Sequence, residues 1–427
     1  MTLLINKVQC LKTRCLCVFI LSKFLRLLKY SSSTINIQAI NDSIDSMGKV
    51  SIVRSQSPPK DFKVKEMVKK AIDLVGGINS VVKKGVTVAL KPNIVTGTTK
   101  QGIITDKRII ESMIKLCFGA GAKKVLIVEG SGYFTTTSEA LEMSGVKSAA
   151  EALGAEVIDV DKDNLIDITL QNPLLVEKIS VSKSFMDADV RINLPVMKTH
   201  DQLLVTLGVK NLKGVIPKFQ KRNFHKVGVV KAIVDLSRVV PVDLTVLDAI
   251  NAMEGLGPSF GEIVPLNTIM ASKDVWSLDL AASRVMGFEL EELDYLVEGK
   301  KFGLLDPEEL NIVGEPIEKI ARKFKRPPTD LEFGKGITVI SDGACSACRG
   351  TIHSVLYDLE QLKLMGEIRD LFIVVGANAK VPKSLKNTPI VMGTCLKAQE
   401  REGCYVVGCP PNNDQMLAAI KQVCKLK

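Results

Sequence analysis

The sequence predicts an α/β protein whose mostly parallel sheets carry flanking helices, arranged as a large domain plus a smaller C-terminal α/β domain. Three observations support this class. Short apolar runs of the kind that form buried strands alternate with segments of helical spacing. Several helical segments stop at glycines, which commonly end helices. At 427 residues, the chain is also longer than one ordinary hydrophobic core supports.

The large domain is expected at residues 47–298. Its strands are expected at residues 50–53, 86–95, 124–129, 155–160, 189–194, 244–247 and 264–270. Its helices are expected at residues 60–82, 107–118, 138–153 and 277–286. Because strands and helices alternate along the chain, we expect a largely parallel sheet.

A linker and a second α/β unit are expected to follow. Residues 299–334 end in the polar, proline-rich stretch KRPPTD, which is typical of a linker. The second unit is expected at residues 335–427. Its strands are expected at residues 337–340, 371–375, 389–392 and 405–407, and its helices at residues 351–363 and 413–423.

Residues 1–46 form an atypical N-terminal extension. Its apolar stretch is broken by Ser22, Lys23 and Arg26, so it holds no uninterrupted run of the length that a transmembrane helix needs. We expect Met47 to be the true first residue, which would make the extension a mis-annotated start. A basic segment on a membrane surface and a signal peptide are the two alternatives.

The amino-acid composition indicates which kind of partner the protein binds and in which kind of compartment we expect it. The formal net charge of +10 suits an anionic substrate or partner. Aromatic residues make up only 5% of the chain, which argues against a stacking surface for single-stranded nucleic acid. Six of the ten cysteines lie after residue 344, and such clustering indicates a metal or redox site rather than a disulfide framework. We therefore expect a reducing compartment, the cytoplasm.

Four cysteines are predicted to form one site in the C-terminal domain. Cys345 and Cys348 follow the first expected strand, Cys395 follows the third, and Cys409 follows the fourth. The carboxyl ends of parallel strands lie along one edge of a sheet, so these loops would deliver the four thiols to one point. Thiolates are soft ligands that select iron–sulfur clusters or zinc.

The spacing of these cysteines favours an iron–sulfur cluster, of the [4Fe-4S] type, because one CxxC pair and two distant single cysteines differ from the two close pairs of a usual structural zinc site. Zinc and a redox dithiol remain alternatives. Cys404 is a rival ligand, but it begins its strand and is expected to point away. Cys117 and Cys424 are interpreted as packing residues.

A basic polar cluster interrupts the apolar pattern of the large domain. Its members follow strand ends and glycine turns, where ammonium and amide groups converging on one point would bind phosphate or carboxylate. We expect this anion site to comprise Lys91, Asn93, Lys198, His200, Lys210, Asn211 and Lys213. Lys198 and His200 are the candidate catalytic residues, with the imidazole as acid or base.

Two neighbouring features are open to other interpretations. The run from Lys218 to Lys226 is expected to be a solvated basic surface loop. Asp248 ends a strand ahead of a glycine-rich loop, where it would hold a divalent metal or a substrate amine, or simply cap the next turn.

Five motifs occur in order along the large domain: KPNIV, NLPVMKTH, VTLGVKNLKGVIP, LDAINAMEGLGP and ASKDVWSLDLAA. Together they resemble the family catalogued as domain of unknown function 362, over roughly residues 48–290. The ACSAC and GCPP segments resemble the tails of archaeal and anaerobic bacterial members, a family that occurs with iron–sulfur centres. The CxxCxxCxxxCP run of ferredoxins is missing here, so the resemblance implies no ferredoxin-type cluster, and it implies no particular reaction.

We therefore expect a cytoplasmic iron–sulfur protein of anaerobic metabolism, a candidate oxidoreductase. It would bind an anionic small molecule in the large domain and exchange electrons with a partner protein through the C-terminal cluster. No specific nucleic-acid partner is expected. Two alternatives are a non-redox enzyme with a structural cluster or zinc, and a protein that delivers metal or clusters to others.

Overall fold

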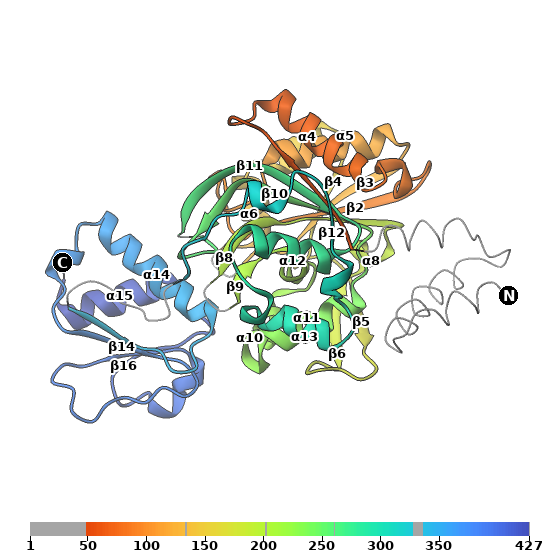
Figure 1. The fold of residues 1–427 in the computed structure, drawn as a ribbon. Coiled ribbons are helices and arrows are strands. Elements are labelled where there is room, and N and C mark those ends of the chain that lie inside the picture. Colours follow the sequence, from red (N-terminus) through yellow and green to blue (C-terminus); the bar gives the residue numbers. More distant parts are fainter. Residues whose placement is uncertain (1–47, 133–134, 201–202, 260, 328–335, 427) are drawn as a thin grey trace.

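The structure is a computed structural model that describes residues 48–132, 135–200, 203–259, 261–327 and 336–426. The three interpretations of residues 1–46 fall outside these ranges. Among the described residues, no helix is both long and apolar enough to cross a bilayer. The described chain forms a large unit and a smaller C-terminal unit, with the C-terminal unit on one side (Figure 1).

The large unit is built on a ten-stranded sheet. In order across the sheet, its main path comprises β12 (Asn311–Gly314), β1 (Lys49–Arg54), β11 (Glu262–Ser272), β10 (Leu244–Glu254), β7 (Val190–Leu194), β2 (Thr87–Pro92), β3 (Lys124–Glu129) and β4 (Glu156–Asp159). Beside this path, β8 (Val196–His200) pairs with β10 and with β9 (Leu204–Thr206). Neighbours pair in parallel except at β1–β11, β10–β11 and β8–β9, so the expected mostly parallel α/β class is confirmed.

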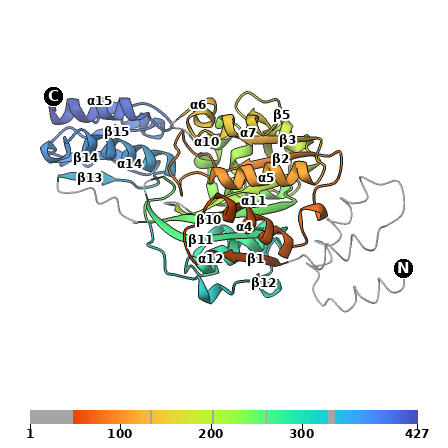
Figure 2. The same cartoon turned by 90° about the horizontal axis from the view of Figure 1, so that it is seen from above.

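Helices cover both faces of this sheet (Figure 2). One face packs against α4 (Asp61–Leu74), α5 (Lys107–Gly119), α6 (Thr137–Met143) and α7 (Val146–Ala152). The other packs against α9 (Gly208–Asn211), α10 (Lys218–Val227), α11 (Val229–Val239), α12 (Val275–Val285) and α13 (Asp294–Lys301), with α8 (Lys183–Asp187) and the hairpin of β5 (Leu165–Thr169) and β6 (Lys178–Ser182). Successive strand residues therefore enter different cores: Val88 and Leu90 join the first and Ala89 the second.

Several segments differ from the sequence-based expectation. The helix expected at 60–82 ends at Leu74 and a 3-10 turn follows at Ile78–Ser80, and the strand expected at 244–247 extends to Glu254. The single helix expected at 138–153 is two helices, because Gly145 adopts a left-handed conformation with φ of 69° between them. The segment 299–334, expected as a linker, contains β12, which pairs in parallel with β1 and extends the large sheet. The expected surface loop at Lys218–Lys226 is helix α10 instead.

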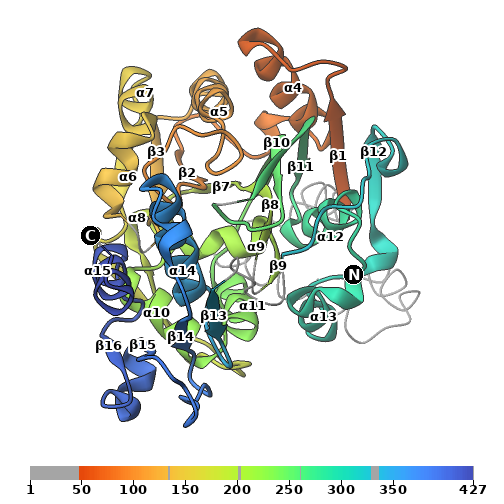
Figure 3. The ribbon, with the colours of Figure 1, turned by 90° about the vertical axis from the view of Figure 1, so that its left-hand side faces the viewer.

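The C-terminal unit is a second, smaller α/β layer (Figure 3). Its sheet has four parallel strands in chain order, namely β13 (Ile337–Ile340), β14 (Leu371–Val375), β15 (Ile390–Met392) and β16 (Cys404–Val406). Two helices pack on one face of it, α14 (Ser346–Gln361) and α15 (Asn413–Cys424). The strands and α15 agree with those expected to within one residue, whereas α14 begins at Ser346, five residues before the helix expected at 351–363, so that Cys348 lies in the helix.

A buried carboxylate fixes the short helix α9. Asp279, on α12, is fully buried and accepts hydrogen bonds from the backbone N–H groups of Gly208 (2.6 Å) and Val209 (3.0 Å). The hydroxyl of Tyr295 also donates to it, at 3.0 Å. The side chain thus satisfies donors at the start of a helix that is too short to be stable alone.

Asp279→Ala is expected to lower the free energy of unfolding by about 3 kcal/mol, because buried donors lose their acceptor. Asp187→Ala is the matched control, since Asp187 is 56% exposed in a surface ion pair, and it should cost less than about 0.5 kcal/mol. Urea unfolding followed by circular dichroism measures both. Equal losses would mean that Asp279 does not anchor α9.

Candidate functional site

The site lies at the carboxyl edge of the large sheet. Strands β7, β2 and β3 are parallel neighbours, so their carboxyl ends lie side by side. The chain leaves β2 through Asn93 and leaves β3 after Glu129. This is the edge at which open α/β sheets bind ligands.

A cavity of about 150 Å³ opens at this edge. Polar side chains from β2, β3, β8, β9, α9 and α10, and from the segments that follow β2, β3 and α9, contribute to its lining, together with one from α14 of the C-terminal unit. These side chains are Lys91, Asn93, Glu129, Ser131, His200, Thr206, Lys210, Asn211, Lys213, Lys221, His225 and His353. The cavity therefore gathers groups from distant parts of the chain.

Most of the residues expected to bind an anion line this cavity. They are Lys91, Asn93, His200, Lys210, Asn211 and Lys213. Lys198 lies behind them: its fully buried ammonium donates to Asn93 Oδ1 and to the carbonyl of Ile103, both at 2.7 Å. Burial, together with the charge of Lys210, sets the pKa of Lys198 well below its ordinary value. Lys198 thus contacts the cavity only through Asn93.

Asp248, the remaining expected site residue, also lies outside the lining. Its carboxylate accepts hydrogen bonds from the backbone N–H groups of Asp106 (2.8 Å) and Ile250 (3.0 Å). Burial and the nearby carboxylate of Asp106 raise the pKa of Asp248 to about 7. Because Asp106 caps α5, these contacts join the start of α5 to β10.

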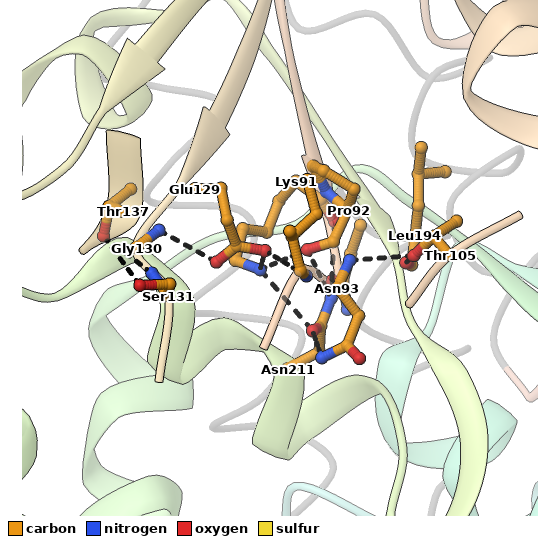
Figure 4. A network of polar contacts seen from close by, with 12 residues as sticks. Lys91, Pro92, Asn93, Thr105, Glu129, Gly130, Ser131, Thr137, Leu194 and Asn211 are labelled. Carbon is orange, nitrogen blue, oxygen red and sulfur yellow. Dashed lines mark hydrogen bonds and ion pairs between the residues drawn. The ribbon is translucent and has the colours of Figure 1, made fainter. Parts of the chain in front are cut away.

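A buried ion pair joins the ends of β2 and β3 (Figure 4). Lys91 Nζ lies 2.8 Å from Glu129 Oε2, and the two side chains are 1% and 2% exposed. Glu129 also accepts hydrogen bonds from the backbone N–H groups of Ile94 and Gly130. Burial lowers the pKa of Lys91 and raises that of Glu129, while the contact between them opposes both shifts. The pair fixes the two loops that enter the cavity.

Amide side chains continue this network. Asn211 Oδ1 accepts a hydrogen bond from Asn93 Nδ2 at 2.9 Å, and Asn211 Nδ2 donates to Asn193 Oδ1 at 2.8 Å. Asn193 in turn donates to the carbonyl of Gly208. Helix α9 is thereby tied to the ends of β2 and β7, which places Lys210 on the cavity wall.

Helix α10 supplies two lining residues from the run interpreted as a solvated surface loop: Lys221, and His225, which the sequence also offers beside His200 as an acid or base. Lys221 is only 4% exposed and donates to the carbonyls of Gly130 (2.6 Å) and Ser131 (3.0 Å), so its assignment to a solvated loop is wrong. Burial lowers the pKa of Lys221 to about 8. His225 Nε2 lies 2.6 Å from Lys213 Nζ. The spacing of four residues between Lys221 and His225, which places them on one helix face, was the available signal.

Lysines are prominent in the part of the cavity lining that the structure describes. They are Lys91, Lys210, Lys213 and Lys221, and the carboxylate of Glu129 pairs with Lys91. Burial and neighbouring lysines also hold the pKa of His225 well below its ordinary value, so this imidazole is neutral at pH 7. A small, cationic and largely buried space of this kind attracts an anion.

The four cysteines expected to bind a cluster gather at one edge of the small sheet. Cys345 caps α14, Cys348 lies in its first turn, Cys395 follows β15 and Cys409 follows β16. A β-carbon on Gly393 would lie 3.5 Å from Cys395 Sγ and 3.8 Å from Cys348 Sγ. A hydrogen bond with Cys345, burial and the thiols of Cys395 and Cys409 all raise the pKa of Cys348. The loops thus bring the four thiols into mutual electrostatic contact.

Thiols are the donor type that holds iron–sulfur clusters or zinc. Burial raises the pKa of the Cys395 thiol, and the backbone N–H groups of Gly376 and Leu396 oppose this shift. Over the described ranges, no three His, Cys, Asp or Glu side chains are placed to hold a metal ion. Cys404 lies elsewhere, lining with Cys424 a depression separate from the four thiols.

Comparison with known proteins finds a matching family model and a relative. Residues 88–284 match the family model described as domain of unknown function 362, which agrees with the resemblance seen in the motifs. A thylakoid-associated protein of Synechocystis sp. is 28% identical over 304 residues, which are 67% of this chain and 90% of that protein. The C-terminal cysteine unit lies outside the family match.

Two solved structures show partial likeness. The lactate racemase apoprotein from Thermoanaerobacterium thermosaccharolyticum is 17% identical with a TM-score of 0.35, covering 56% of this chain and 57% of that one. A protein from Thermotoga maritima is 16% identical with a TM-score of 0.33, covering 50% of this chain and 55% of that one. The chain thus spans a little more than half the length of either.

Gly214→Ala is expected to disrupt the buried ion pair. A β-carbon at this position would lie 2.2 Å from Lys91 Cε and 2.3 Å from Glu129 Oε1, so the substitution should cost about 1–3 kcal/mol of stability. Gly366→Ala is the control, because a β-carbon there meets nothing within 4 Å. Thermal unfolding compares them, and an unchanged melting temperature for Gly214→Ala would show that the pair is not held as closely as described.

Proposed function

We propose that this chain, whose residues 88–284 match the family model described as domain of unknown function 362, is an iron–sulfur protein that binds a small anion beside its cluster. The anion would occupy the cavity at the edge of the large sheet. A [4Fe-4S] cluster would be held by Cys345, Cys348, Cys395 and Cys409. When bound, it supplies one-electron chemistry.

The observation that carries this proposal is the position of α14. The helix begins at the CxxC pair, and two residues in its following turns, Gly350 and His353, line the anion cavity. With a rise of about 1.5 Å per residue, Cys348 and His353 lie roughly 8 Å apart along the helix axis. At that separation, charge at one site acts on the other even at physiological ionic strength.

We prefer an iron–sulfur cluster over zinc because of the groups that surround the four cysteines. Four thiolates suit an iron–sulfur cluster or zinc, and zinc remains the alternative ion. Backbone N–H groups directed at the Cys395 sulfur favour a cluster, since such hydrogen bonds tune cluster potentials. Thiols kept reduced for this purpose need a reducing compartment, which is why we propose the cytoplasm.

In the cavity, His200 is the proposed acid or base. Its imidazole lines the cavity and is 3% exposed, so it would reach a bound anion directly. Lys198 would position Asn93 rather than touch the ligand, because its ammonium donates to Asn93 Oδ1. We propose that an electron-transfer protein binds at the edge of the small sheet where the four cysteines lie.

Cys409→Ser is expected to lower the iron and acid-labile sulfide of anaerobically purified protein to less than about half, because one thiolate ligand is lost. Cys404→Ser is the matched control and should leave both contents unchanged, since this residue lies away from the four thiols. Metal and sulfide analysis with EPR measures the effect. Full-length protein with no iron or sulfide, or equal losses in both variants, would contradict the proposal.

A further inference from the structure

Cys404 and Cys424 are two thiols that the proposed cluster does not use. Cys404 begins β16 and Cys424 ends α15, and both side chains are partly exposed. Both line the same depression of the C-terminal unit, which has a volume of about 640 Å³. Thiols that solvent reaches can exchange with a disulfide, whereas fully buried thiols are inert.

The depression lies at the amino edge of the small sheet, opposite the edge of the four cysteines. Its lining includes Asp370, Thr388 and Gly403, which lie just before the starts of β14, β15 and β16. Residues 422–425, at the end of α15, line it from the helical layer. Helix α15 begins after the carboxyl end of β16 and packs on the sheet, so its last residues return to the edge where the strands begin.

Both thiols face the layer between the sheet and α15. Side chains alternate along a strand, so Cys404 points to the same face as Val406, which is buried in the core under α14 and α15. On α15, Cys424 follows Ile420 by four residues and Met416 by eight, and both of these are buried in the same core. Cys404 and Cys424 also pack against this core. The two thiols therefore enter one layer at one edge.

The lining of the depression suits a small anionic reagent. Its basic side chains are Arg369, Lys386 and Lys425, and Asp370 is a carboxylate among its described lining residues. Its volume is within the range of roughly 300–1,000 Å³ that is usual for sites of small organic molecules. Glutathione disulfide, which carries carboxylates, belongs to this class of reagent. Burial raises the pKa of both thiols, which keeps them protonated and makes their exchange slow at neutral pH.

We infer that Cys404 and Cys424 form a reversible redox pair, which a small disulfide such as glutathione disulfide oxidises to an intramolecular disulfide. One cysteine attacks the reagent, which forms a mixed disulfide and releases one small thiol. The other cysteine then attacks the protein sulfur of that mixed disulfide and releases the second small thiol. Two protein thiols are thus oxidised, the reagent is reduced to two thiols, and these carry away the two protons. The inference goes beyond the proposed function, because it needs neither the cluster nor the anion cavity.

The test treats full-length protein, purified anaerobically, with millimolar glutathione disulfide at about pH 8, followed by peptide mapping with mass spectrometry. We expect a Cys404–Cys424 disulfide in more than about half of the protein, and its loss when reduced glutathione is added in excess. Cys117 is the internal control. Its side chain is 0% exposed, so its thiol should stay unmodified as long as the protein is folded.

A variant separates the two steps of the exchange. Cys424→Ser removes one partner, so the mixed disulfide with glutathione should accumulate on Cys404 instead of the internal bond. In the unsubstituted protein, stable mixed disulfides on both cysteines without a bond between them would overturn the pairing. Unmodified Cys404 and Cys424 would overturn the redox assignment altogether. Either result leaves the proposed cluster untouched, because iron and sulfide content measures that proposal separately.

Discussion

The buried pair of Lys91 and Glu129 is the constraint on which the site depends. Both side chains are almost completely removed from water, so the ionised pair is stable only while its remaining donors and acceptors are satisfied. The backbone N–H groups of Ile94 and Gly130 donate further hydrogen bonds to the Glu129 carboxylate. Gly214 has no side chain, which leaves room for Lys91 and Glu129 to meet. Loss of either partner would cost about 3–5 kcal/mol, because the other charge would remain buried.

Two further sets of contacts extend from this pair. Asn211 fixes α9 to the segment that follows β2, through its hydrogen bond with Asn93. Asp279 fixes the start of α9 by accepting a hydrogen bond from the backbone N–H of Gly208. Lys221 brings α10 onto the loop after β3. The result is a rigid wall of cationic groups around a small space, and rigidity of this kind favours binding because little conformational entropy remains to be lost. Helix α14 closes the same space from the side of the cysteine edge.

The sequence was informative where signals are local. Apolar strands alternating with helices predicted the class of both units, and polar residues such as Lys91 and Asn211 that interrupt apolar segments were recognised as unusual. Glu129 was not predicted as a site residue, because a glutamate at the end of a strand is common in surface loops. The pairing of β2 with β3 brings its carboxylate to Lys91. The places of Lys221 and His353 in the cavity lining were missed for a related reason: they depend on elements remote in sequence. The same holds for β12, whose partner β1 lies more than two hundred residues earlier.

We propose that the anion cavity and the cysteine site act on each other through α14. The most direct measurement is an EPR-monitored redox titration of cluster-loaded protein with and without saturating inorganic phosphate. Negative charge beside the cluster disfavours reduction, so phosphate should lower the midpoint potential by about 20–60 mV, where 59 mV corresponds to a tenfold change for a one-electron couple. An unchanged potential in protein shown to bind phosphate would contradict the coupling of the two sites.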